Sequence, residues 1–338
     1  MLKNILVTSL ATFTLLMSGC GGDSEGESIL ETQQLLDQGN FSGVIAKLDS
    51  SASSDDDYLA LGAAYMGKAG FTLPDVVDAL TSSTTLGEGE AFASYVKAVI
   101  GDEPSPSAFS DLEKANISYT KVVGSLCLAG TKKLSSSEQD VCLYVGLALT
   151  TQAATTISLL TDNLGTFGTG EIDPKLQASA CAMQYVLDPS KVDGACAVSP
   201  KSNVTFSESQ KTYGRIEVAV NGTLNDFLLT NNNTATILTV GYCSNNSFET
   251  RQDEKKFGYF PCPINEAVGE NDVTTGGVLV ETLNDGLDLV DTMAPSDMKD
   301  DVDEFKCEIL GGYFNGYSCS VGGNITEQVV IDYLTKNK

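Results

Sequence analysis

The chain has 338 residues, 42% of them hydrophobic, and its 45 acidic and 20 basic side chains give a formal net charge of −25 at pH 7. Such an acidic chain repels phosphate backbones, which argues against nucleic-acid binding, while its hydrophobic content indicates a globular protein. Because the chain contains no histidine, it has neither Ser-His-Asp nor Cys-His catalytic groups, and no histidine metal ligands.

The N-terminal 19 residues have the three parts of a secretory signal: an early Lys3, an apolar run over residues 5–17, and small residues before Cys20. This run is too short for a membrane span, which needs about 20 apolar residues. The block Met17-Ser18-Gly19-Cys20 resembles the lipobox of bacterial lipoproteins. The resemblance implies cleavage before Cys20 and attachment of a diacylglycerol to its thiol.

The next residue is Gly21 rather than the Asp that retains lipoproteins at the inner membrane, so the resemblance implies anchoring in the outer membrane. We therefore expect a signal peptide over residues 1–19 and a lipidated, flexible tether over residues 20–28. Several acyl chains hold a protein firmly on a bilayer, where one chain would not.

Eight further cysteines remain, an even number that predicts disulfides in an exported protein. They fall into four neighbouring pairs separated by 15, 15, 19 and 12 residues. The sequence alone does not select among the many possible pairings, and the short separations favour sequential pairing. The predicted pairs are Cys127 with Cys142, Cys181 with Cys196, Cys243 with Cys262, and Cys307 with Cys319.

Residues 29–200 are predicted to form an α-helical, repeat-like domain. The pattern Ser28-Ile29-Leu30-Glu31 is typical of a capping box that opens the first helix. Two turns follow, one at Gly39-Asn40-Phe41 and one at Ala69-Gly70-Phe71, with helices before, between and after them. Asp57 precedes the third of these helices.

In that third helix, Tyr58, Leu61, Gly62 and Tyr65 stand at the spacing of the tetratricopeptide pattern W-x2-L-G-x2-Y. Residues 28–82 resemble tetratricopeptide repeats, although their turns are 30 residues apart rather than the usual 34 or so, and Pro74 replaces a small alanine. The resemblance implies helical hairpins with a concave surface for partners. Tyr58, Leu61, Tyr65 and Phe71 are the candidates for that surface, and packing between helices is the favoured alternative for them.

Further helices are expected over residues 90–100 and 107–123, and over residues 139–164 after a capping box formed by Ser135 and Glu138. The stretch Val141–Leu160 carries no charge, so a membrane span is an alternative to a core helix. Its many threonines and the disulfide partner required by Cys142 favour a buried central helix.

The pattern changes near residue 213. Residues 215–220 alternate between polar and apolar side chains and lead into Asn221-Gly222, a strong hairpin signal. Return strands are predicted over residues 223–230 and 235–242, although apolar residues at every fourth position leave a helix as the alternative. Helices then resume over 278–290, 296–309 (capped by Ser296) and 326–334, and residues 311–323 form a loop. The predicted fold class is thus mainly α, with helical hairpins or a helical bundle. Residues 201–338 are expected to form a disulfide-stabilised α+β region that contains a small β-meander.

No catalytic, metal or cofactor site is predicted. Three Ser-x-x-Lys matches, which begin at Ser94, Ser118 and Ser296, lack the Lys-Thr-Gly that accompanies them in serine acyl-enzymes. The glycine-rich residues 165–170 lack a P-loop lysine. The acidic clusters at residues 55–57, 284–288 and 297–304 fit helix capping or a solvated face better than a calcium loop.

We therefore expect a non-catalytic, lipid-anchored protein of the cell envelope that presents a helical surface to a protein partner. The alternative is a lipoprotein that binds a small molecule or a divalent cation, for which the acidic composition would favour cationic ligands.

Overall fold

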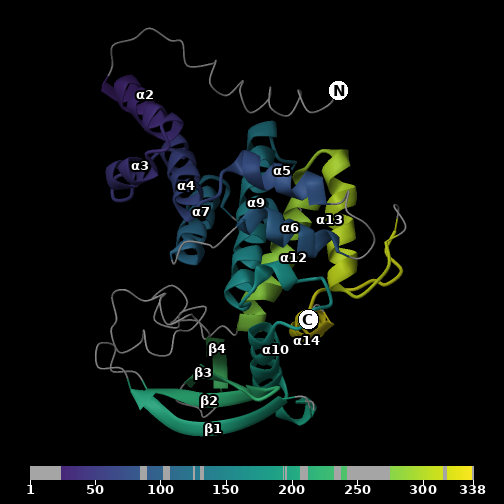
Figure 1. Cartoon of the computed structure of the whole chain (residues 1–338). Coiled ribbons are helices and arrows are strands. Elements are labelled where there is room, and N and C mark those ends of the chain that lie inside the picture. Colours follow the sequence, from purple (N-terminus) through teal and green to yellow (C-terminus); the bar gives the residue numbers. More distant parts are fainter. Residues whose placement is uncertain are drawn as a thin grey trace.

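The structure, a computed structural model, describes residues 24–83, 90–101, 107–124, 126–129, 133–192, 194, 196–205, 212–231, 237–241, 275–314 and 318–336. Helices make up most of this described chain, and one small antiparallel sheet is attached at the edge of the helical body (Figure 1). The predicted fold class is therefore confirmed.

The N-terminal helices form hairpins: α2 spans Ser24–Asp37, α3 spans Phe41–Leu48 and α4 spans Asp55–Ala69. The predicted capping box at Ser28 is wrong, because α2 already begins at Ser24 and Ser28 lies inside it. The Ser-x-x-Glu pattern also suits a helix interior. The expected flexible tether is wrong for residues 24–28 for the same reason.

The capping box occurs instead at the start of α4. The Ser54 hydroxyl accepts from the amide of Asp57, whose carboxylate accepts from the amide of Ser54. The predicted turn at the end of α4 is confirmed, because Gly70 takes the left-handed conformation (φ +101°) that glycine adopts without strain. Its amide donates to Gly67 and the amide of Phe71 donates to Met66, as in a Schellman motif. Two of the polar groups left free at the helix end are satisfied in this way.

Several of the remaining helices, α5, α6, α7 and α12, pack against α9 in the middle of the body (Figure 1). The helices before the sheet are α5 (Leu73–Ser83), α6 (Ala91–Ile100), α7 (Ala108–Val123), the short α8 (Leu126–Ala129), α9 (Ser136–Leu159) and α10 (Pro174–Leu187), with 3-10 turns at Leu164–Thr166 and Pro189–Lys191; those after it are α12 (Thr275–Met293), α13 (Ser296–Ile309) and α14 (Glu327–Lys336). Helix α13 begins at Ser296 as predicted, but Pro295 holds the cap position.

Within the described residues, α9 is the one helix whose length and apolar composition would allow it to span a membrane. The predicted capping box of Ser135 and Glu138 opens it. The most apolar window of this helix is 83% buried inside the protein. Its buried threonines donate to carbonyls one turn earlier in α9, for example Thr151 to Leu147 and Thr155 to Thr151. These hydroxyls are therefore satisfied locally, and α9 occupies the predicted position of a buried central helix.

The sheet is a meander of β1 (Cys196–Thr205), β2 (Thr212–Val220), β3 (Thr223–Asn231) and β4 (Ile237–Gly241), hydrogen-bonded in that order. The predicted hairpin is confirmed, since Asn221 and Gly222 both have positive φ, +49° and +83°, as a type I′ turn requires. The helical alternative for this region is wrong. Strand β1 was missed, because residues up to 199 were expected to be helical.

One face of the sheet packs on α10 through a small cluster that we call the sheet core. It consists of Ala178, Cys181, Ala182, Ile216, Val218, Val220 and Phe227. The helices that precede the sheet in the sequence and those that follow it share a second, much larger core. The predicted division at residues 200 and 201 therefore does not separate two cores; the sheet is inserted between two parts of one helical body.

Candidate functional site

Three of the four candidates for the interaction surface are buried. Leu61, Tyr65 and Phe71 are 5%, 2% and 4% exposed, and Tyr58 is half-buried. The Tyr65 hydroxyl donates to Asp49, and burial together with this bond raises the pKa of the tyrosine. The structure therefore shows the packing alternative for Leu61, Tyr65 and Phe71, whose side chains belong to the core and not to a surface.

Gly62, at the glycine position of the same pattern, allows a close helix contact, but with α7. A Cβ atom at Gly62 would lie 2.4 Å from the ring of Tyr119. Helix α7 comes some 40 residues later in the chain, whereas a repeat solenoid stacks neighbouring hairpins. The tetratricopeptide resemblance stays a prediction.

Three of the predicted disulfides are present: Cys127–Cys142, Cys181–Cys196 and Cys307–Cys319. The lipidation candidate Cys20 and the fourth predicted pair, Cys243 and Cys262, lie outside the described residues.

In the first acidic cluster, Asp57 lies inside α4 and not before it as expected, and it forms the capping box of this helix with Ser54. The segment 284–288 lies within α12, where the Asn284 amide group donates to the carbonyl of Ile325 and accepts from its amide. No group of three or more potential metal ligands occurs among the described residues. The three Ser-x-x-Lys serines lie on the separate helices α6, α7 and α13, and Ser118 donates to the carbonyl of Lys114.

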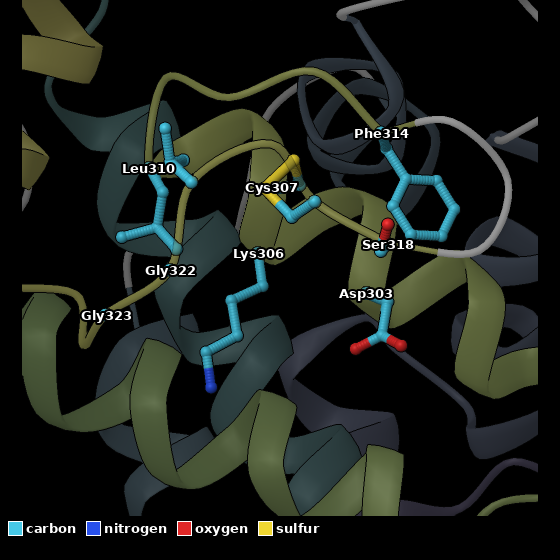
Figure 2. Close-up of a pocket in the computed structure, with 10 residues that line it drawn as sticks. Asp303, Lys306, Cys307, Leu310, Phe314, Ser318, Gly322 and Gly323 are labelled. Carbon is cyan, nitrogen blue, oxygen red and sulfur yellow. A yellow bond between two sulfur atoms is a disulfide. The ribbon is translucent and has the colours of Figure 1, made fainter.

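A surface hollow of about 240 Å³ lies between the C-terminal half of α13 and the loop that follows it. Figure 2 shows the disulfide near its middle, with Phe314 on one side and Leu310 on the other. The lining residues are Asp303, Lys306, Cys307, Leu310, Phe314, Ser318, Cys319, Val321, Gly322 and Gly323.

A Schellman motif at the end of α13 fixes the start of this loop. Gly311 has φ +73°, and the amides of Gly311 and Gly312 donate to the carbonyls of Glu308 and Cys307. At Gly312 a Cβ atom would lie 2.7 Å from the sulfur of Cys319 and 2.5 Å from Val321. Only glycine allows the chain to pass this close to the disulfide.

Further contacts hold the described parts of the loop, residues 313–314 and 318–325. Phe314 and Cys319 form an antiparallel bridge, and the amide of Ser320 donates to the carbonyl of Tyr313. The paired hydrogen bonds between Asn284 and Ile325 fasten the chain to α12 just beyond it. The hollow therefore lies between a helix and a loop held by a disulfide and several hydrogen bonds.

The hollow combines exposed apolar side chains with an acidic edge. Val321, in its lining, is 39% exposed, and Leu310 and Phe314 are half-buried. Lys306 is paired with Asp288 of α12 at 2.8 Å. Partial burial and the nearby charges of Asp291 and Asp300 raise the pKa of Asp303, although Lys306 and Lys299 lower it in part. A further cation beside Asp303 would relieve the remaining repulsion.

A second unusual group, Glu308, lies deeper at the same end of α13. One of its oxygens accepts from the amide of Phe92, at the start of α6, and the other from the hydroxyl of Tyr333, at 2.7 and 2.6 Å. Burial raises the pKa of Glu308 to about 6, although hydrogen bonds from Tyr333, Phe92 and the amide of Ala93 lower it. Tyr333 and Phe92 are buried, so Glu308 links three helices.

Sequence reasoning predicted the loop over residues 311–323 and its closing disulfide, but it missed the hollow and Glu308. The signal for the loop was the pair of glycines directly after a helix with a cysteine in its last turn. No comparable signal exists for Glu308, because its partners are 216 and 25 residues away. No protein-family model, curated protein or solved structure matches this chain.

Proposed function

We propose that the protein is a lipid-anchored component of a bacterial outer membrane that presents the α13 side of its helical body to a protein partner, without catalysing a reaction. The observation that carries the proposal is the lipobox-like block Met17-Ser18-Gly19-Cys20 at the end of a short apolar run. The acyl chains would be attached four residues before α2 begins at Ser24. The anchor would thus adjoin the N-terminal hairpins with little free chain between them.

The geometry of the described body supports the second half of the proposal. In Figure 1, α2 and the loop after α13 lie on opposite sides of the molecule. A body anchored through α2 would therefore keep the hollow beside Cys307–Cys319 clear of the attachment point. Protein partners bind best to prearranged surfaces with apolar anchor points, because little conformational entropy is lost on association.

The anchor is tested by comparing the full chain with a Cys20→Ser variant in a Gram-negative host fed an alkyne fatty acid. We expect the unaltered chain to carry the label and to fractionate with outer membranes, and the variant to lose both properties. Equal labelling or equal fractionation of the two chains would overturn the lipid anchor.

Presentation to a partner is tested by in-cell crosslinking of the tagged full chain, followed by membrane purification and mass spectrometry. A single stoichiometric envelope protein is the expected result. A monomer without any crosslinked partner would overturn the interaction function.

A further inference from the structure

We propose that the hollow beside the Cys307–Cys319 disulfide accepts one large apolar side chain from a basic segment of the partner protein. This inference rests on the proposed function and adds the chemistry of the partner.

The size of the hollow favours a single side chain. Its volume of about 240 Å³ is below the roughly 300–1,000 Å³ of typical small-molecule and cofactor pockets. The hollow is open to the surface, so it suits an anchor residue that projects from a larger partner.

The walls provide apolar contact. Leu310, Phe314 and Val321 line the hollow, and Val321 is 39% exposed. Large apolar groups that stay exposed next to a hollow are typical of interaction sites. The disulfide and the Gly311-Gly312 turn fix these walls before binding, which lowers the entropic cost of association.

The charge at the edge identifies the rest of the segment. Asp303, at the edge of the hollow, makes no hydrogen bond or ion pair with any residue in the described part of the chain, and it is repelled by Asp291 and Asp300 and attracted by Lys306 and Lys299. Lys306, the cation in the lining, is already paired with Asp288. A lysine or arginine of the partner is therefore the complementary group for Asp303, and it matches the net charge of −25.

The probe is a fluorescent peptide, Gly-Lys-Lys-Phe-Lys-Lys-Gly, with the detergent-solubilised full chain. Two further peptides carry Ala in place of Phe, or Glu in place of every Lys. Binding is measured by fluorescence anisotropy at low and high salt. We expect the first peptide to bind at least about tenfold more tightly than the alanine peptide, because an aromatic anchor dominates such contacts, and to weaken as salt screens the charges.

Two variants test the two features of the hollow, its apolar cavity and its acidic edge. Gly322 lines the hollow and has no heavy atom within 4 Å of the position of a Cβ, so Gly322→Phe can begin a side chain there, and its ring is expected to block the hollow and abolish binding. Asp303→Asn is expected to weaken binding about threefold to fivefold, as for an exposed ion pair. Asp56→Asn removes the same charge from the exposed start of α4 and should leave binding unchanged.

Three results would overturn the proposal: no saturable binding, equal binding of the phenylalanine and alanine peptides, or equal binding to Gly322→Phe and the unaltered chain. Unchanged thermal unfolding of Gly322→Phe establishes that this variant is folded.

Crosslinking separates the two proposals. If a stoichiometric partner is captured equally by Gly322→Phe, the hollow is not its site although the interaction function holds; if no partner is captured, the interaction function fails as well.

Discussion

Inside the large core, helices α9 and α12 cross at two glycines that face each other. The sheet and the loop after α13 lie at the edge of that core, and a disulfide attaches each of them to a helix. A Cβ at Gly146 would lie 2.9 Å from that of Leu289, and one at Gly286 would lie 3.0 Å from the amide nitrogen of Thr150. By contrast, the buried apolar side chains of the sheet that the structure describes form a separate small core on α10.

This difference indicates two kinds of stability in one chain. Close packing in the centre makes the helices depend on one another, so damage there should spread through the whole body. The attachments have few apolar contacts, and their cysteines compensate by restricting the unfolded chain. Damage to them should remain local.

Gly286→Leu should have the largest effect. Because the backbone of α9 is so close, the added side chain must push the two helices apart, at a cost of about 3 kcal/mol or more. Urea unfolding followed by circular dichroism measures this loss. Gly322→Ala, whose Cβ enters open space, is the matched control and should unfold like the unaltered chain.

Removing the Cys181–Cys196 disulfide with two serines should cost about 3 kcal/mol, the value for a loop of this length. The loss should be confined to the sheet, since the bond joins α10 to β1. Hydrogen exchange followed by mass spectrometry should show faster exchange in residues 196–205 and 212–231 and unchanged exchange in α9. Faster exchange throughout the helical body would contradict the distinction between centre and attachments.

Glu308→Gln should stabilise the protein at neutral pH. The folded pKa of about 6 lies above the ordinary value of 4.5, so the folded state binds the proton more tightly. Stability from this group is therefore lost as the pH rises from about 4.5 to about 6, by about 2 kcal/mol. Glutamine resembles the protonated acid, since its amide can donate to Tyr333 while its oxygen accepts from Phe92.

The measurement is the difference in unfolding free energy between this variant and the unaltered chain at several pH values. It should be near zero below pH 4.5, rise up to about pH 6 and then stay constant. Glu304→Gln, one turn earlier in α13 and more exposed, is the control and should give a smaller change. A difference independent of pH would show that Glu308 does not titrate in this range.

The sequence predicted the features that depend on neighbouring residues and missed those that depend on contacts between distant segments. The turns at Gly39 and Gly70, the hairpin at Asn221-Gly222 and the three described disulfides depend on residues close together in the sequence. Strand β1 was missed because its pairing with β2, and not its own pattern, makes it a strand. The contact between Gly62 and Tyr119 and that between Glu308 and Phe92 join distant segments, which a single sequence does not reveal.

The smallest predicted effect compares two tyrosines that are both fully buried in the central core. The hydroxyl of Tyr119 has no hydrogen-bond partner among the described residues, whereas that of Tyr95 donates to Thr150 at 3.2 Å. An unsatisfied buried hydroxyl costs free energy, so Tyr119→Phe should stabilise the protein by about 1 kcal/mol and Tyr95→Phe should destabilise it by about as much. Chemical unfolding of both variants at one pH measures the two changes. A loss of stability in Tyr119→Phe would mean that its hydroxyl has a partner in the folded protein, and the contrast between the two sites would disappear.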